Sequence, residues 1–145
     1  MRAVWYEESG DANVLQVGEM PDPDPGPGEV RVRVVISGIN PSDWKMRARA
    51  MRFPKIIPNQ DGSGVIDSVG EGVPASRVGE RVWLYESNFD SAYGSAAEYT
   101  VQPAKHAVPL PESASFSDGA CLGVPAMTAH RSVFADGPVT GKTVL

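Results

Sequence analysis

The sequence has 145 residues and a formal net charge of −5, with 41% hydrophobic and 21% charged residues. This composition is ordinary for a globular protein, and the length suits one domain. The chain lacks the basic excess that nucleic-acid binding requires. No stretch approaches the roughly 20 apolar residues of a membrane-spanning helix, and no Lys/Arg run marks an anionic membrane surface. We therefore expect neither a nucleic acid nor a membrane as a partner.

Cysteine usage points to a reducing compartment. Cys121 is the only cysteine, so no internal disulfide can form, and we expect it to be a small core residue. The N-terminal residues lack the apolar centre of a signal peptide. The expected location is the cytoplasm.

Alternating apolar residues predict strands over most of the chain. Residues 29–36 give the clearest strand, because Val30, Val32 and Val34 share one face and charged residues share the other. The other expected strands are residues 2–6, 13–20, 62–69, 81–85, 97–101 and 106–110. The 15 glycines and 13 prolines supply turns between them.

Three segments suit short helices: residues 42–49, 117–122 and 127–134. Ser42 or Asp43 would cap the first helix and Ser117 the second. Residues 142–145 begin an apolar strand. The sum predicts a mainly β protein with short helices, built as a partly open β-barrel.

Six groups of residues then follow one another in an order that is typical of one family. They are GINPSDWKMR (38–47), IPNQDGSGVI with VGEGV (57–66 and 69–73), VGERV (78–82), GSAAEY (94–99), VPLP (108–111) and GACLGVPAMTAH (119–130). Each alone is weak, but together they cover almost the whole chain. The sequence resembles the zeta-crystallin-like quinone reductases, zinc-independent members of the medium-chain dehydrogenase/reductase family.

The resemblance implies a GroES-like, substrate-side domain over residues 1–125. Residues 126–145 would then be a connecting helix and the first strand of a Rossmann domain. No G-x-G-x-x-G occurs, so we expect the chain to be truncated before that nucleotide-binding domain. In the family, NADPH reduces a quinone or an enone, and the parent protein is expected to be a homodimer. Most contacts to NADPH would lie in the missing domain.

Zinc is not expected. The positions that match the zinc ligands of zinc-dependent relatives are Asn40, Gln60 and Val124, and none of them is a strong zinc ligand. Asp61 alone could not hold the metal. Without a Lewis acid, the resemblance favours acceptors that are already activated by conjugation.

The same resemblance assigns roles in the cleft. Asn40 would donate a hydrogen bond near the nicotinamide or the acceptor carbonyl, or cap the helix that begins at Pro41. Gln60 would hydrogen-bond in the cleft or merely fill it. Thr128 would contact the nicotinamide or cap a helix. Asp43 would cap the helix or anchor its loop.

Three further residues are candidates for the acceptor side. Lys45 replaces a tyrosine of the relatives, and it would be a proton donor if buried and inert if exposed. Trp44 is its neighbour in the proposed substrate cleft. Tyr93, with Tyr85 and Phe89, would form an aromatic wall for a flat ring or pack at the barrel edge.

Two other functions stay open at this point. The chain could be a non-enzymatic binding module with the GroES-like fold, or part of an enoyl-thioester reductase that shares fold and cofactor. As a piece of a quinone or enone reductase, the 145-residue chain alone is expected to be inactive and to bind NADPH weakly.

Overall fold

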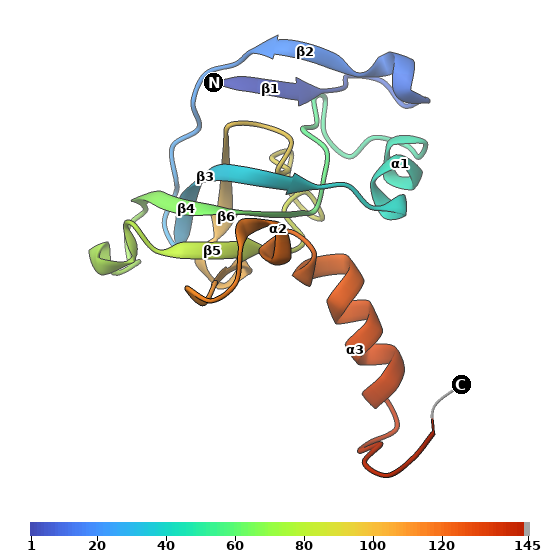
Figure 1. Ribbon diagram of the computed structural model, residues 1–145. Helices are drawn as coiled ribbons and strands as arrows, with labels where there is room; N and C mark the ends of the chain where they lie inside the picture. Colours follow the sequence, from blue (N-terminus) through green and yellow to red (C-terminus); the bar gives the residue numbers. More distant parts are fainter. Residues whose placement is uncertain (144–145) are drawn as a thin grey trace.

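The computed structural model describes residues 1–143, in which the strands form two antiparallel sheets (Figure 1). β1 (Arg2–Trp5) pairs with β2 (Gln16–Glu19). The second sheet has the order β6-β3-β4-β5-β7, formed by β3 (Glu29–Gly38), β4 (Asp61–Val69), β5 (Arg81–Leu84), β6 (Tyr99–Pro103) and β7 (Ala107–Pro109). Its edges, β6 and β7, do not close on each other. The expected mainly β, partly open architecture is confirmed.

The β1–β2 pair is tied to the rest of the molecule by backbone hydrogen bonds. Tyr6 and Ile56 exchange two of them at 3.0 Å, and the Val4 N–H donates to the Ala96 carbonyl at 2.8 Å. The pair therefore lies over the larger sheet, as Figure 1 shows.

The apolar core lies where β3, β4 and β5 meet. Val30 and Val32 are fully buried, as the alternation predicts, and pack with residues of the neighbouring strands: Ile66, Val82, Leu84 and Ala107. Register shifts follow Arg31 and Val34 in the β3–β4 ladder. Val34, at the second shift, is only half-buried.

The helices begin earlier than predicted. α1 (Pro41–Arg47) is capped by Asn40, not by Ser42 or Asp43, because Pro41 lacks the N–H that the first helical position leaves unused. α2 (Phe116–Gly119) is capped by Ser115, not by Ser117, since only Ser115 has an acidic residue, Asp118, three positions on. The alternative cap at Asn40, before Pro41, is confirmed, whereas the caps predicted at Ser42 or Asp43 and at Ser117 were wrong. α3 (Met127–Phe134) agrees with the predicted range.

Short irregular helices account for other differences. A 3₁₀ turn, η1 (Ala12–Val14), capped by the Asp11 carboxylate, replaces the start of the second predicted strand. Similar turns are η2 (Ala75–Arg77) and η3 (Ala104–His106). The π-type turn η4 (Leu122–Ala126) is kinked at Gly123, where ψ is −108°.

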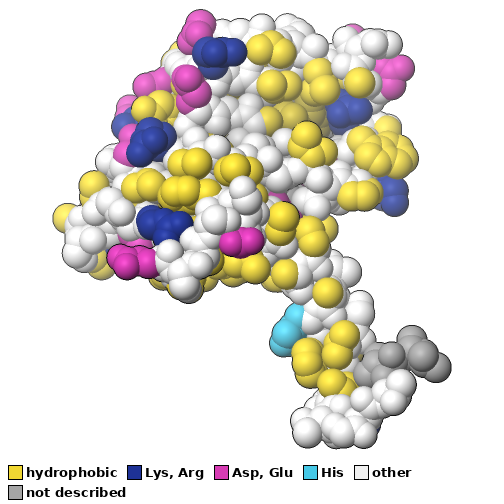
Figure 2. All heavy atoms as spheres, in the orientation of Figure 1, with side chains coloured by type: hydrophobic (Ala, Val, Ile, Leu, Met, Phe, Trp, Pro, Cys, Tyr) yellow, Lys and Arg dark blue, Asp and Glu magenta, His cyan; other side chains and the backbone are white. Residues whose placement is uncertain are grey.

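The C-terminal part projects away from the sheets. α3 extends from the body in Figure 1, and apolar side chains along it, Met127, Val133 and Phe134, are exposed (Figure 2). Lys142 and Thr143 are not in a strand, and the rest of the predicted last strand, Val144 and Leu145, lies outside the described residues.

Cys121 is exposed, so its prediction as a core residue was wrong. At the junction between α2 and η4, Ala120 and Gly123 are the residues that turn inward. Over residues 1–143, the helices are too short or too polar to cross a bilayer.

Candidate active site

A buried carboxylate joins three segments of the chain. Asp61, the first residue of β4, is 0% exposed. Its Oδ2 atom accepts hydrogen bonds from Asn40 Nδ2 at 2.8 Å and from the Val124 backbone N–H at 2.7 Å. Asp61 thereby links the start of α1, the start of β4 and the η4 turn.

The other oxygen of this carboxylate is buried without a partner within residues 1–143. It lies against Gly123, where an added Cβ would sit 2.1 Å from Asp61 Oδ1, so the close approach requires glycine. Burial raises the pKa of Asp61 above its ordinary value, and the hydrogen bonds from Asn40 and Val124 oppose that rise.

A second buried carboxylate, Asp43, fixes the loop around the first. Its Oδ2 accepts the Asn40 backbone N–H at 2.7 Å, and its Oδ1 accepts the Gln60 backbone N–H at 3.2 Å. Burial also raises the pKa of Asp43. Asp43 therefore both completes the helix start and anchors the loop before β4, the two structural roles considered for it.

The side chain of Gln60 is held by α1. Its Nε2 atom lies 3.3 Å from Ser42 Oγ and 3.3 Å from Met46 Sδ. The preceding residue, Asn59, has a φ of 75°, a left-handed conformation that asparagine tolerates better than most residues. The turn at Asn59 directs Gln60 and Asp61 to the same place.

A cleft of about 200 Å³ opens beside these residues. It runs from the start of β4, past the loop after β5, to the start of α3, and its walls include Gln60, Asp61, Tyr85, Phe89, Gly123 and Thr128. Asn40 is buried behind the cleft and reaches it through its bond to Asp61. Asn40, Gln60 and Thr128 are therefore brought together.

Other candidates lie outside this cleft. Lys45 and Trp44 are on the exposed side of α1, where Trp44 is 54% exposed and the Lys45 ammonium lies 5.8 Å from its ring centre. Tyr93 is also partly exposed, and its backbone carbonyl accepts hydrogen bonds from Thr100 and Gln102. Tyr85 and Phe89 are the aromatic residues of the expected wall that do line the cleft.

The histidines belong to packing contacts. His106 stacks on Tyr85 with ring centres 4.6 Å apart, and His130 lies 4.9 Å from the ring of Phe134 on α3. Within residues 1–143, no three His, Cys, Asp or Glu side chains are grouped so as to hold a metal.

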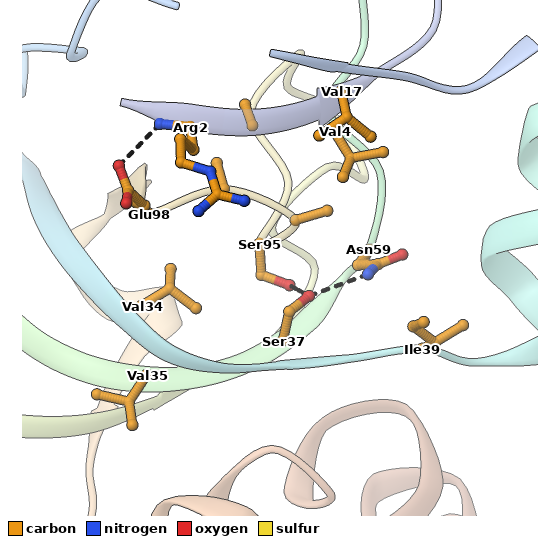
Figure 3. A pocket seen from close by; sticks show the side chains of 13 residues that line it. Arg2, Val4, Val17, Val34, Val35, Ser37, Ile39, Asn59, Ser95 and Glu98 are labelled. Carbon is orange, nitrogen blue, oxygen red and sulfur yellow. Dashed lines mark hydrogen bonds between the residues drawn. The ribbon is translucent and has the colours of Figure 1, made fainter. Parts of the chain in front are cut away.

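A larger hollow, of about 440 Å³, lies between the β1–β2 pair and the end of β3 (Figure 3). Its polar groups bond one another: Asn59 Nδ2 donates to Ser37 Oγ at 2.9 Å, and Ser37 and Ser95 share a hydrogen bond of 2.8 Å. Aliphatic side chains such as Val17, Val34 and Ile39 form much of the remaining wall. The cleft at Asp61, with its buried carboxylates, is the better candidate for chemistry.

Sequence reasoning missed the residues that assemble the cleft. It considered Asp61 only as a metal ligand, whereas the structure makes it the centre of the hydrogen bonds, and it passed over Gly123 and Met46. The sequence does point to Asp61, because it directly follows Gln60 in the motif of residues 57–66. The bond to Val124, 63 residues away, has no local signal.

Comparison with known proteins identifies the family of the chain. Residues 26–112 match the alcohol dehydrogenase GroES-like domain. A quinone oxidoreductase from Rattus norvegicus is 35% identical over 92% of this chain and 41% of its own length. A trans-enoyl reductase from Gibberella fujikuroi is 35% identical over 68% of this chain and 29% of its own.

The fold is shared with solved structures. A mycobacterial protein in complex with NADPH superposes with a TM-score of 0.82 at 27% identity, covering 96% of this chain and 42% of the other. The chain spans about two fifths of the length of the rat quinone oxidoreductase, 41%. The chain thus belongs to the alcohol dehydrogenase GroES-like domain family and is of the zeta-crystallin-like medium-chain type.

Proposed function

We propose that the protein contributes the acceptor side of an NADPH-dependent quinone or enone reductase that works without zinc. The observation that carries the proposal is the cleft built around Asp61, where the positions expected for zinc ligands hold Asn40, Gln60 and Val124. Neither carboxamide is a strong zinc ligand, and the side chain of Val124 has no donor atom. The carboxamide groups at these positions suit a carbonyl oxygen better than a metal ion.

Asn40 is proposed to hold the acceptor. One N–H of its amide donates to Asp61 at 2.8 Å, and the carboxamide has a second N–H, which we assign to the acceptor carbonyl. Asp61 is a positioning residue here, because its bond fixes the plane of the Asn40 amide. Gln60 is fixed in the same way by Ser42 and Met46. A preorganised donor such as the second N–H of Asn40 favours charge that develops on an oxygen.

The residues also fit the nicotinamide end of NADPH. The cleft, about 200 Å³ in volume, has room for one ring, and the exposed Thr128 at its edge offers a hydroxyl to a carboxamide. When bound, NADPH supplies the hydride, and the protein orients it. Tyr85 and Phe89 would flank that ring.

The proton that completes the reduction is proposed to come from Lys45 or from solvent. Lys45 is exposed outside the cleft, so it could serve only at the open rim, where Trp44 and Tyr93 would meet the acceptor. A Lys45→Met variant with an unchanged pH–rate profile would assign the proton to solvent.

A second candidate is reduction of an enoyl thioester. It is favoured by the likeness to the Gibberella fujikuroi trans-enoyl reductase, although that likeness covers 68% of this chain against 92% for the rat quinone oxidoreductase. The acceptor chemistry is the same, a conjugated carbonyl, so only substrate comparison separates the two.

The test uses the full-length protein that contains this chain. NADPH oxidation is followed at 340 nm with 1,2-naphthoquinone, with crotonyl thioester and with cyclohexanone as a saturated control. We expect turnover with the quinone, none with cyclohexanone, and no effect of a zinc chelator. Stoichiometric zinc in elemental analysis, or no turnover with any conjugated acceptor, would refute the proposal.

The remaining assignments follow from this function. Residues 1–125 are the proposed acceptor-side domain and residues 126–145 the proposed connection to a Rossmann domain that provides most NADPH contacts. We propose a homodimeric, cytoplasmic parent protein. The 145-residue chain alone should be inactive and should bind NADPH more weakly than micromolar in calorimetry. Micromolar binding would contradict this division.

A further inference from the structure

A second cavity, here called the α1 cavity, lies beside α1, on the side of Tyr6. Its volume is about 200 Å³, and its apolar walls are Tyr6, Met46, Met51, Phe53, Ile56 and Phe89. The volume equals that of about seven water molecules in the liquid. One six-membered ring or a chain of about six carbons would fill such a space.

Cationic and neutral donors border the α1 cavity, and within residues 1–143 no carboxylate side chain is among the residues that line it. Arg49 and Arg52 both line it. Arg52 donates to the Phe89 carbonyl at 2.7 Å and pairs with Asp90 at 2.5 Å, whereas Arg49 has no carboxylate partner within residues 1–143. Five of the 13 Lys and Arg residues fall within positions 45–55 of a chain with net charge −5. On the face in Figure 2, such side chains adjoin hydrophobic ones around α1.

Tyr6 adds a neutral donor. The residue is buried, lines the cavity, and its hydroxyl bonds no other described residue. Burial is the main cause that raises the pKa of Tyr6, so the phenol keeps its proton at neutral pH. The remaining polar wall residue, Asn88, can present either end of its amide. A ligand that satisfies Arg49 and Tyr6 must bring acceptor oxygens and negative charge.

The α1 cavity adjoins the cleft at Asp61. Phe89 lines both spaces. Gln60, in the cleft, and Met46, in the cavity, touch through Nε2 and Sδ at 3.3 Å. The two spaces therefore share a wall, and a ligand in the α1 cavity lies against residues that also contact the cleft.

We propose that the α1 cavity binds the apolar body of a small carboxylate-bearing acceptor, with the carboxylate held by Arg49 and the conjugated end directed to the cleft at Asp61. That the ligand is a hydride acceptor rests on the proposed reductase function. That the cavity binds an apolar carboxylate rests on the residues of the α1 cavity alone.

The test measures binding without turnover. Hexanoate, hexan-1-ol and hexylammonium are titrated into the ¹⁵N-labelled 145-residue chain, and amide shifts are followed by NMR. We expect hexanoate to shift the resonances of the cavity walls and to bind about tenfold more tightly than hexan-1-ol, as one charge-assisted hydrogen-bond pair allows. Hexylammonium should not bind there.

Variants test whether the charge of Arg49 binds the carboxylate of hexanoate. Arg49→Met should weaken hexanoate about tenfold and leave hexan-1-ol unchanged. Arg131→Met, which removes an exposed arginine on α3, is the matched control and should change neither. Phe53→Ala should weaken both ligands, and the dispersion of the spectra shows that each variant is folded.

Equal affinity for the acid and the alcohol, or hexanoate binding unaffected by Arg49→Met, overturns the proposal. The full-length protein then separates this inference from the proposed function. Quinone turnover without hexanoate binding rejects the cavity assignment alone. Hexanoate binding without any NADPH oxidation rejects the reductase and, with it, the acceptor role of the ligand, while the carboxylate site stands.

Discussion

Asp61 and Ile66, in the first and second halves of β4, are both fully buried but are held by different chemistry. At the Ile66 end, apolar side chains of β3, β4 and β5 pack together. At the Asp61 end, Asp61 and Ser63 are both 0% exposed, and hydrogen bonds replace apolar contacts. Ser63 Oγ donates to the Phe116 carbonyl at 2.6 Å, and Asp61 accepts from Asn40 and Val124.

The two halves of β4 should therefore tolerate substitution to different degrees. Apolar packing tolerates a similar shape, because no atom needs a particular partner. A buried hydrogen-bonded group tolerates little, because removing one partner leaves the other without a bond. One strand thus provides a stable core at one end and a fixed geometry for a cleft at the other.

The largest effect is expected at the apolar end. Ile66→Ala removes three carbons from a fully buried side chain and should lower the free energy of unfolding by about 2–5 kcal/mol. Ile66→Val, as the control, should cost about 0.5–1.5 kcal/mol. Urea denaturation measures both. Equal costs for the two variants would mean that packing does not dominate there.

The polar end should respond next. Asp61→Ala removes the acceptor of two hydrogen bonds, which leaves the Asn40 amide and the Val124 N–H buried without their partner. The expected loss is about 2–4 kcal/mol, measured by the same denaturation. Asp67→Ala, which removes a partly buried carboxylate from the same strand, should cost less. A larger loss for Asp67→Ala would show that the buried hydrogen bonds of Asp61 contribute less than a partly buried ion pair does.

Gly123 tests how tightly the polar end is closed. A Cβ at this position would lie 2.1 Å from Asp61 Oδ1, so Gly123→Ala should cost about 1–3 kcal/mol through overpacking. In the Asp61→Ala background the clash is gone, and the same substitution should cost almost nothing. A double-mutant cycle measures this coupling. If the losses in unfolding free energy were additive, the side chains at positions 61 and 123 would not clash.

The contrast between the ends of β4 also explains what the sequence could predict. Strand positions at 29–36, 62–69 and 81–85 were within two residues of β3, β4 and β5, because alternation is a local signal. Residues 13–20 failed in part, since Asp11 caps a 3₁₀ turn that apolar alternation does not reveal. The caps predicted at Ser42 or Asp43 and at Ser117 were misplaced by two or three residues for the same kind of reason, a side chain that bonds backbone groups, while the alternative cap at Asn40 was right.

The site was predictable only where a motif named its residues. Gln60 and Thr128 do line one cleft, and Asn40 lies behind it, bonded to Asp61. Lys45 and Trp44 do not, because the buried side of α1 is set by Ser42, Asp43 and Met46, and the helical period turns the two residues between them outward. The hydrogen bonds of Asp61 with Asn40 and Val124, which are distant in the sequence, could be recognised only from the fold.

The smallest expected effect on stability is that of Asp61→Asn, which removes the charge of the side chain but keeps its shape. Asn40 and Val124 both bond Oδ2 of Asp61, so the amide oxygen of an Asp61→Asn variant can keep both bonds. We expect its stability to lie within about 1 kcal/mol of the parent at neutral pH. Its pH dependence should differ more clearly.

Burial raises the pKa of Asp61 in the folded state, so between the unfolded and the folded pKa the native protein holds a proton that the unfolded chain has lost. Stability from this group is therefore complete below its unfolded pKa and falls as pH rises through the folded one. Asp61→Asn lacks that fall, while Asp43, whose pKa is also raised, keeps its own share. Urea denaturation from pH 4 to pH 7 should give a flatter slope for the variant than for the parent. Superimposable slopes would mean that the pKa of Asp61 is the same in the folded and unfolded states. The charge of Asp61 would then make no pH-dependent contribution to the stability of this half of β4.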